Sequence, residues 1–534
     1  MFSVASFKQR RESACAMLLQ LLWCLFVALL FIFRNGYQFN CYDQEEHLPL
    51  VYKLARPSLY PHDYFVQPAS AHTTVRTYYA WTVYAFSKIW TVETVCFLLF
   101  ITCVTLAGFF ILKIAQRAFG NGWSSYLAPV FVLLLYNAWT VGGNPVMDLQ
   151  LLGSGFALVF CLAAVWQFID GRYYATGILL GIASIYQVLM GLHLMMILIP
   201  VLLLTKKKAP LKKIAAPVLL YIIFSCPVLI PVLLQQFVKQ PAHDRALANY
   251  ALINFRQAHH YLPRAFPVAA YLHHTALLAL AAIALLLMKI KQRQFFFLSA
   301  AVVIAGCIVY TIGFELLQSA LVAKTQWFKT TVWTTAFAGI ILAGFAGQLA
   351  EVLLPASRLQ QRFWMPALVV FNVLLLLHIT NQPLFTHPSW LGRYMVGKYP
   401  HADITKMHEW IKTHTPEDAV ILSFPYDPSL LCESQRSTPV TYKAIIHEPA
   451  LIEKWYHDFT RIYNIDDTPG PINIPRKDFI AKATEWYNRA GNTVLSKRCR
   501  YNYRIAETGT AGAMADSGEI VHREGNYVLL KNRQ

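Results

Sequence analysis

Charged residues are scarce in this sequence: Asp, Glu, Lys and Arg make up 14% of its 534 residues, whereas about 25% is usual for a soluble chain. Hydrophobic residues make up 56%, and the mean hydropathy is +0.41. This composition argues against a soluble multi-domain enzyme. It also excludes intrinsic disorder, because a chain with 14% aromatic residues would collapse.

Acidic residues are scarcer than basic ones, with 28 Asp and Glu against 46 Lys and Arg, which gives a net charge of +18. The excess lies entirely in residues 1–399, which hold 29 basic and 11 acidic side chains, while residues 400–534 hold 17 of each. A basic excess confined to the apolar part of a chain is typical of a polytopic membrane protein and not of a DNA-binding surface. We therefore expect no nucleic acid partner.

Long apolar runs are what the chain has in abundance. A membrane-spanning helix needs about 20 mostly apolar residues. The runs that meet or approach this length are 16–33, 92–112, 125–139, 149–169, 174–205, 214–236, 270–289, 295–314, 331–350 and 364–381. The run 174–205 is too long for one span, and Gly191 near its middle predicts two helices with a tight turn. We therefore predict about eleven transmembrane helices, the first being an uncleaved signal anchor.

Basic residues predict the orientation of these helices. They cluster in alternate connections, at Lys8, Arg10, Arg11, Lys113, Arg117, Arg172, Lys206, Lys207, Lys208, Lys212, Lys213, Lys289, Lys291, Arg293, Arg358 and Arg362. Because such clusters stay in the cytoplasm, we expect a protein of the plasma (inner) membrane with a cytoplasmic N-terminus and residues 382–534 outside. Eight of the 11 acids and all 11 histidines of residues 1–399 then lie on or near the outer side. The sequence therefore predicts that the chemistry takes place outside.

The first predicted outer segment, residues 34–91, carries a dense polar cluster. Its members are Asp43, Glu45, Glu46 and His47. If a short helix starts near Asp43, then Asp43 and His47 share one face at i, i+4 spacing. The cluster is our candidate for a general base, a metal-ligand set or both, and the alternative is a solvated helix cap at the membrane surface. Candidate substrate-binding residues of the same segment are Arg56, Asp63 and Arg76.

A second informative stretch follows the seventh predicted span, at residues 254–264. Because the adjacent His259 and His260 point in different directions, one can orient or protonate a substrate while the other is structural. Arg256 and Arg264 could hold a phosphate bidentately. The alternative is a set of interfacial loop residues with Tyr261 in an aromatic belt.

Two weaker signals lie at other predicted outer ends. Lys324 and Lys329, near the tenth span, either hold an anionic lipid head group or act as ordinary interfacial anchors. The stretch 142–145 reads as a turn and is followed by Asp148.

Residues 400–534, after a linker at 383–400, have the composition of a soluble domain. The pattern predicts helices at 404–414, 449–463 and 478–490, and strands at 419–424, 440–443, 501–505, 519–522 and 527–531. This order predicts a small α/β domain. It contains no Gly-rich phosphate loop, no G-x-S-x-G and no Cys/His zinc spacing. Its candidate contact residues are Arg436, Lys443, Glu453, Trp455, Tyr456 and Arg461, and a Cys432–Cys499 disulfide is a hypothesis.

The architecture and four short motifs resemble the GT-C superfamily of membrane glycosyltransferases, and within it a group of uncharacterised bacterial multi-pass proteins. The motifs are 43–49 (DQEEHLP), 57–63 (PSLYPHD), 259–261 (HHY) and 415–419 (TPEDA). The resemblance covers nearly the whole chain. It implies a mainly α-helical polytopic membrane protein, residues 1–399, with a C-terminal extracytoplasmic α/β domain, residues 400–534.

The resemblance also implies an activity. A GT-C enzyme transfers a sugar from a polyprenyl-phosphate-linked donor in the membrane to a glycan, lipid or protein acceptor on the outer face. The acidic residue of the first outer loop that acts as base or metal ligand best matches Asp43, with Glu45 or Glu46 as second choice. Gln44 interrupts the adjacent Asp-Glu pair of the family, and the cofactor stays open, with a divalent cation as the candidate.

Two other classes of protein remain as alternatives. One is a non-catalytic envelope or polysaccharide assembly protein that keeps the same shell. The other is a transporter, against which the placement of nearly all ionisable groups at helix ends argues. A ligase or polymerase of lipid-linked glycans would use outer Arg and His similarly, without needing the C-terminal domain.

Overall fold

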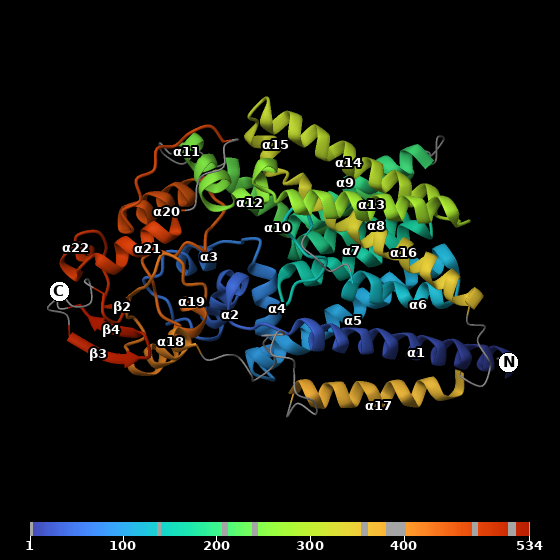
Figure 1. Cartoon of the computed structure of the whole chain (residues 1–534), viewed down its shortest axis with the longest axis horizontal. Coiled ribbons are helices and arrows are strands. Elements are labelled where there is room, and N and C mark those ends of the chain that lie inside the picture. Colours follow the sequence, from blue (N-terminus) through green and yellow to red (C-terminus); the bar gives the residue numbers. More distant parts are fainter. Residues whose placement is uncertain are drawn as a thin grey trace.

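The computed structural model describes residues 4–135, 140–205, 212–237, 244–353, 361–380, 402–472, 479–510 and 519–532. They form a bundle of long helices with a smaller domain at one end (Figure 1). The helices of the bundle are α1 (Val4–Asn35), α5 (Val92–Phe119), α6 (Trp123–Val130), which continues as the π-helix η2 (Phe131–Leu135), α7 (Gly153–Ile169), α8 (Tyr173–Tyr186), α9 (Val188–Thr205), α10 (Lys212–Phe237), α13 (Val268–Leu287), α14 (Arg293–Glu315), α16 (Thr331–Leu353) and α17 (Gln361–Thr380).

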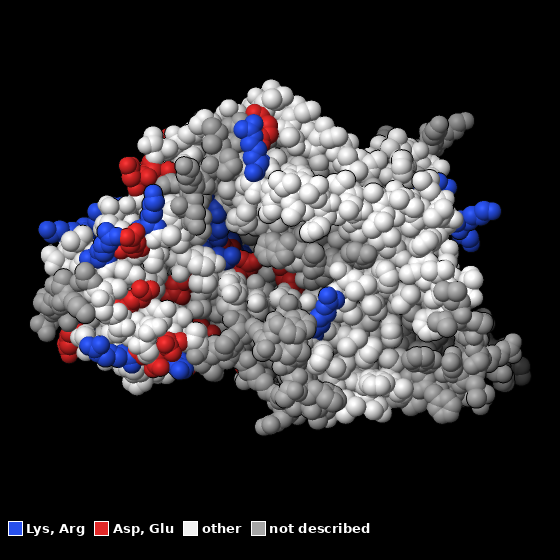
Figure 2. All heavy atoms as spheres, viewed as in Figure 1, with Lys and Arg blue, Asp and Glu red and all other residues white. Residues whose placement is uncertain are grey.

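The bundle is built to sit in a membrane. Among the described residues, seven helices are long and apolar enough to span a bilayer, and four further apolar helices are shorter. Figure 2 shows a flank of the bundle almost without charged side chains, while charged residues gather on the C-terminal domain and at the opposite end. The expectation of a helical polytopic membrane protein is thereby confirmed.

The long apolar run 174–205 is divided as predicted, but at a different residue. The break is at Gln187, whose backbone is extended between α8 and α9. Gly191 lies inside α9, where a Cβ atom would collide with Ser184 Oγ and come within 2.5 Å of the Leu180 carbonyl oxygen. Its lack of a side chain therefore allows α9 to pack closely on α8, and it does not form the turn.

The two ends of the bundle differ in what they carry. The start of α1 lies at one end and the C-terminal domain at the other (Figure 1). At the end far from the C-terminal domain, Arg117 at the close of α5 pairs with Asp170 at the close of α7, with a Nη2–Oδ2 distance of 2.9 Å. The predicted linker 383–400 and the basic residues Lys206, Lys207, Lys208 and Arg358 lie outside the described residues.

Two connections fill the space between the bundle and the C-terminal domain. The first, between α1 and α5, holds the 3-10 helix η1 (Tyr42–Glu46), α2 (Leu48–Ala55), α3 (Val66–Ala71) and α4 (Thr77–Ser87). The second, between α10 and α13, holds α11 (Arg245–Tyr250), the π-helix η3 (Ala251–Arg256), α12 (Ala258–Tyr261) and the 3-10 helix η4 (Pro263–Ala265). A shorter connection before α16 holds α15 (Ala320–Lys324) and the 3-10 helix η5 (Trp327–Thr330).

The C-terminal domain is a mixed α/β unit. Its elements are α18 (Asp403–His414), β1 (Ile421–Leu422), α19 (Leu430–Ser434), α20 (Pro449–Ile462), α21 (Ile480–Arg489), α22 (Asn492–Ser496), β2 (Tyr503–Glu507), β3 (Glu519–Glu524) and β4 (Tyr527–Lys531). The strand order is β1-β2-β4-β3, with β1 parallel to β2 and the other neighbours antiparallel. Met407 and Ile411 of α18 pack in one core cluster with Ile505 and Leu529 of the sheet.

Two local expectations for this domain fail. Residues 440–443, predicted as a strand, have no strand structure, because Tyr442 and Lys443 turn toward the first and second connections instead of pairing in the sheet. Cys432 and Cys499 are both free thiols, and the Cys432 Sγ atom lies 3.4 Å from the Gln44 carbonyl oxygen.

The domain is fastened to the bundle by aromatic packing. Phe255 of η3 stacks on Phe479 with a centroid distance of 4.3 Å and meets the rings of Trp455 and Tyr456 edge-on. The Tyr442 hydroxyl donates to the Phe255 carbonyl at 2.8 Å. Buried aromatic contacts of this kind are a large apolar contribution to an interface, so the two connections and the domain form one continuous core.

Candidate functional site

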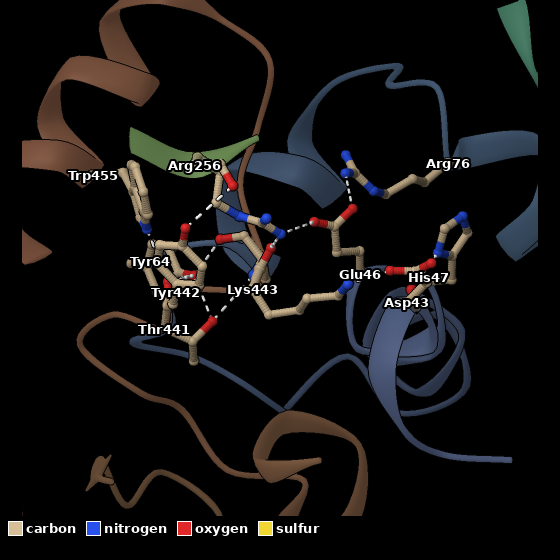
Figure 3. Close-up of polar contacts among 11 residues, drawn as sticks. Asp43, Glu46, His47, Tyr64, Arg76, Arg256, Thr441, Tyr442, Lys443 and Trp455 are labelled. Carbon is tan, nitrogen blue, oxygen red and sulfur yellow. Dashed lines mark hydrogen bonds and ion pairs between the residues drawn. The ribbon is translucent and has the colours of Figure 1, made fainter. Parts of the chain in front are cut away.

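A cluster of ionisable residues lies where the two connections meet the C-terminal domain. Glu46 of η1 is at its centre, and two guanidinium groups reach it from different sides (Figure 3). Arg76, at the start of α4, forms an ion pair with Glu46 Oε2, and Arg256 Nη2, at the end of η3, lies 3.7 Å from Glu46 Oε1. All three side chains are almost fully buried.

The neighbouring arginines keep Glu46 ionised. Burial alone would raise the pKa of this carboxyl, but Arg76, Arg256 and Lys443 together lower it to about 2. Arg256 is itself held in place, because its Nη2 donates to the Lys443 carbonyl at 2.6 Å and its guanidinium lies 4.9 Å from the Tyr442 ring centroid. Glu46 is therefore an ionised, buried carboxylate that organises two cations.

Asp43 is the accessible carboxylate of the same turn. Its side chain is 51% exposed and forms an ion pair with Lys443 of the C-terminal domain. The loop that carries Lys443 is clamped, since Tyr64 Oη donates to the Thr441 carbonyl at 3.1 Å and Trp455 Nε1 donates to the same oxygen at 2.8 Å. Figure 3 shows Lys443 between Asp43 and Arg256. Of the cluster's two central carboxylates, Asp43 is the one that a substrate can reach.

The backbone before Asp43 is strained and held by hydrogen bonds. Asn40 and Tyr42 have φ angles of 63° and 50°, a region that non-glycine residues seldom adopt. The Asn40 amide donates to Gln44 Oε1 at 2.6 Å, and Tyr52 Oη donates to Asn40 Oδ1 at 2.8 Å. These bonds fix the turn that presents Asp43 and Glu46.

His47 makes the predicted i, i+4 contact with Asp43, but through the backbone. Its Nδ1 lies 2.9 Å from the Asp43 carbonyl oxygen, and its ring meets Tyr79 edge-on at 4.9 Å. Burial, helped by the nearby Arg76, lowers the pKa of His47 to about 4. His47 is therefore neutral at pH 7, and its Nδ1 donates to the Asp43 carbonyl and stabilises the turn.

Sequence reasoning missed His447. This histidine is partly buried near Glu46, Arg76 and Arg256, and loss of solvent around it lowers its pKa to about 3. It is four residues from Lys443, at the far side of the same clamped loop. The one feature of the sequence that points to His447 is its position four residues after Lys443. No local sequence pattern shows that residues 441–447 fold back onto η1.

A second group of residues extends the cluster along the bundle end. His260 Nδ1 lies 3.3 Å from the Gly142 carbonyl oxygen. A Cβ atom at Gly142 would come within 2.6 Å of the Lys329 amide nitrogen, so the glycine allows the predicted turn to pack directly on η5. Asp148, after that turn, is close enough to Lys329 and Asp43 for their charges to affect its titration, although burial is the main reason that its pKa rises to about 6.

Two of the predicted catalytic or binding acids are structural. Glu45 is fully buried, and its carboxylate accepts from the amides of Leu431, at 2.9 Å, and Cys432. Asp63 is also buried, and it accepts from the amides of Phe65, Val66 and Thr438 at 2.7–2.9 Å. Both carboxylates therefore join the first connection to the C-terminal domain.

Several predicted cations lie away from the cluster. Arg56 pairs with Glu417 at 2.7 Å on the surface. Ser58 Oγ donates to the same carboxylate at 3.0 Å, so two of the short motifs contact each other there. Arg264 pairs with Glu315 at 2.8 Å, and Lys324 lies in α15. Tyr261 is buried and has a structural role, because its hydroxyl accepts a hydrogen bond from Gln326 Nε2 at 2.6 Å. His259 is exposed, and its ring lies beside that of His260, with centroids 4.1 Å apart and planes tilted by 47°.

An apolar groove leads along the bundle toward this cluster. It has a volume of about 1020 Å³ and lies between α13 and α14, with α16 as its floor. Phe297 and Ile308 on its wall are 64% and 56% exposed on the flank of the bundle. Its lining includes Val141 and Phe328, the residues directly before Gly142 and Lys329. The groove therefore ends beside the second group of polar residues.

No metal centre is built into this arrangement. Within the described ranges, no group of three or more His, Cys, Asp and Glu side chains has a geometry that could hold a metal ion. Glu46 already has two arginine partners. Asp43 pairs with Lys443 but is half exposed, so of these two carboxylates it is the one that a bound cation could still reach.

Comparison with known proteins gives a local match. A family described as a domain of unknown function (DUF6798) matches residues 402–462, from α18 to the end of α20. No curated protein matches the chain. The matched segment supplies Lys443 and His447 to the cluster.

Proposed function

We propose that this protein is a GT-C-type membrane glycosyltransferase that moves a sugar from a polyprenyl-phosphate-linked donor to an acceptor hydroxyl. The observation that carries the proposal is the apolar groove that ends beside Lys329, in the group of polar residues that extends the cluster with the accessible carboxylate Asp43. A lipid-linked donor needs both parts, since its tail requires an apolar channel from the bilayer and its phosphate requires positive charge.

The proposed reaction assigns a task to each part of the cluster. Asp43 accepts the proton of the acceptor hydroxyl, whose oxygen attacks the anomeric carbon of the donor sugar. The bond between that carbon and the phosphate oxygen breaks, and polyprenyl phosphate leaves as an anion. Lys329 and Lys443 are the cations placed to stabilise the leaving phosphate. Arg256 is largely engaged by Glu46 and the Lys443 carbonyl, so its task is to hold the site together.

The proposal includes a topology. Eleven spans, the N-terminus in the cytoplasm and the C-terminal domain outside are supported by the seven long and four shorter apolar helices and by the opposite placement of the two termini. Basic residues at the far end of the bundle, such as Arg117, agree with this orientation. The reaction would then take place on the outer face of the plasma membrane.

The test uses purified full-length protein in lipid nanodiscs with radiolabelled polyprenyl-phosphate sugars and candidate acceptors. Asp43→Asn should lower the transfer rate by a factor of about 100 or more, because positioned general bases contribute that much. Asp418→Asn is the matched control, since Asp418 is an exposed acid of the C-terminal domain away from the cluster. Undiminished transfer by Asp43→Asn would remove Asp43 as base, and no transfer from any donor would refute the proposed function.

A further inference from the structure

A second cavity lies in the C-terminal domain, separate from the apolar groove. Its volume is about 630 Å³, within the range of roughly 300–1,000 Å³ typical of small-molecule sites. Its walls come from residues 39–42 of the first connection, from residues 424–429 after β1, and from parts of α18, α21 and the sheet. It is therefore formed only when the C-terminal domain is docked on the first connection.

Aromatic side chains line this cavity. Tyr42 and Tyr426 are each 41% exposed, and Phe39, Phe424 and Tyr527 are partly buried beside them. Large aromatic faces left open to water in a concave site mark a place where an apolar surface binds. The C–H face of a sugar ring is such a surface, and it leaves the hydroxyl groups free at the rim of the ring.

The charged groups among the described residues of the cavity wall are all carboxylates. The described residues that line it include Asp427, Glu433 and Glu507 and no Lys, Arg or His. Asp427 is already engaged, because its Oδ2 accepts from His408 Nε2 at 2.9 Å and from Ser423 Oγ at 2.6 Å. Glu507 Oε2 accepts from Asn488 at 3.0 Å, but a carboxylate has about four acceptor positions, so it can still bind hydroxyl groups.

These features select the ligand by charge. Hydroxyl and amino groups donate to carboxylates and form strong charge-assisted hydrogen bonds. A phosphate or a carboxylate on the ligand would instead meet like charges, with no cation in the wall to offset the repulsion. The cavity is thus suited to a sugar chain without acidic groups and unsuited to the phosphate of the lipid-linked donor.

We propose that this cavity binds a neutral or amino-bearing oligosaccharide as the acceptor and directs one of its hydroxyl groups to Asp43. The cavity and the proposed base are adjacent in the chain, because Tyr42 in the cavity wall is followed directly by Asp43. The acceptor role rests on the proposed glycosyltransferase function, whereas sugar binding by the cavity does not. The inference places the acceptor in the C-terminal domain and the donor in the groove of the bundle.

The first test measures binding to the full-length protein in nanodiscs by fluorescence anisotropy. The labelled probes are cellotriose, a glucosamine trimer and a galacturonic acid trimer. The neutral and amino-bearing trimers should bind, and the acidic trimer should bind at least about tenfold more weakly. Tyr426→Ala should weaken cellotriose binding about tenfold, a loss of about 1.4 kcal/mol, and Glu507→Gln should reduce the discrimination against the acidic trimer. Tyr174→Ala is the control, because this tyrosine is 49% exposed on α8, outside the cavity.

The outcomes separate the inference from the proposed function. Failure of all three trimers to bind, preference for the acidic trimer, or no effect of Tyr426→Ala would overturn the sugar site. Binding that depends on Tyr426 with no transfer from any lipid-linked donor would refute the proposed function and keep the cavity as a sugar site. Transfer that depends on Asp43 but not on Tyr426 would refute the acceptor role and keep the proposed function.

Discussion

The buried ion pairs of Glu46 join the first connection to the second, and Arg256 in turn holds the Lys443 carbonyl of the C-terminal domain. Glu46→Gln therefore measures how strongly these pairs support docking of that domain. The substitution keeps the shape of the side chain but leaves Arg76 and Arg256 buried without their shared counter-charge. The pKa of Glu46 falls from its ordinary 4.5 to about 2 because of these neighbours, which corresponds to about 3 kcal/mol of stabilisation. We expect Glu46→Gln to lower the stability of the docked state by about this amount.

The thiol of Cys432 reports on docking. It is fully buried against the first connection, with its Sγ atom 3.4 Å from the Gln44 carbonyl oxygen, so a maleimide can reach it only when the domain opens. A loss of about 3 kcal/mol should raise its labelling rate by a factor of about 100, measured by mass spectrometry of the Cys432 peptide. Cys499, which is only partly buried, serves as the internal reference.

A matched control comes from an exposed ion pair that directly joins the first connection to the C-terminal domain. Arg56 and Glu417 are 62% and 46% exposed, and such pairs contribute about 0–1 kcal/mol. Glu417→Gln should therefore raise the labelling of Cys432 by less than about fivefold. If Glu46→Gln is labelled no faster than Glu417→Gln, the buried pairs do not hold the interface and the reasoning is wrong.

Acid, loop and turn variants test other parts of the structure. Because the pKa of Glu46 is lowered on folding, its stabilisation is complete above pH 4.5 and is lost as the pH falls toward 2. The labelling of Cys432 relative to Cys499, a ratio that removes the loss of thiolate in acid, should rise as the pH falls over this range in the wild type and much less in Glu46→Gln. Asp148 has the opposite sign, since burial raises its pKa from 3.8 to about 6, so the Tm advantage of Asp148→Asn over the wild type should grow from pH 4 to pH 6 and stay constant above; an advantage that shrinks with pH would contradict the burial of this group. Gly142→Ala should lower thermal stability by about 1–3 kcal/mol, because a Cβ atom would lie 2.5 Å from the Phe328 carbonyl; Gly155→Ala, whose Cβ would meet only the flexible end of Met147 at 3.6 Å, is the control, and equal effects of the two would refute the close packing of the turn.

Local patterns in the sequence predicted most of the helices. Apolar runs determine transmembrane helices because length and composition suffice in a bilayer, and the amphipathic helices α18, α20 and α21 follow from their periodicity. The division of the run 174–205 at Gln187 instead of Gly191 depended on contacts with Leu180 and Ser184, which no local pattern contains. Residues 440–443 have the composition of a strand, yet their side chains are used in the interface with η3 and η1.

The candidate site could be predicted only in part. Asp43, Glu46 and Arg256 were indicated by their density of charge in otherwise apolar sequence. The sequence could not tell a buried structural carboxylate such as Glu45 from an accessible one, because their difference lies in which backbone amides face them. Lys443 and His447 come from a segment 400 residues away, which approaches η1 only after the C-terminal domain has docked.

Both the ionisable cluster and the sugar cavity are completed when the C-terminal domain docks on the bundle. Lys443 neutralises Asp43, and the segment 39–42 completes the wall of the sugar cavity, so neither the cluster nor the cavity exists in an undocked domain. Because Arg256 is a partner of Glu46 and also contacts the Lys443 carbonyl and the Tyr442 ring, opening the domain would remove one side of the support of this buried ion pair. The fold therefore couples the charge of the site to the assembly of its two halves, and a variant that loosens the interface should weaken acceptor binding without changing a residue of the cavity.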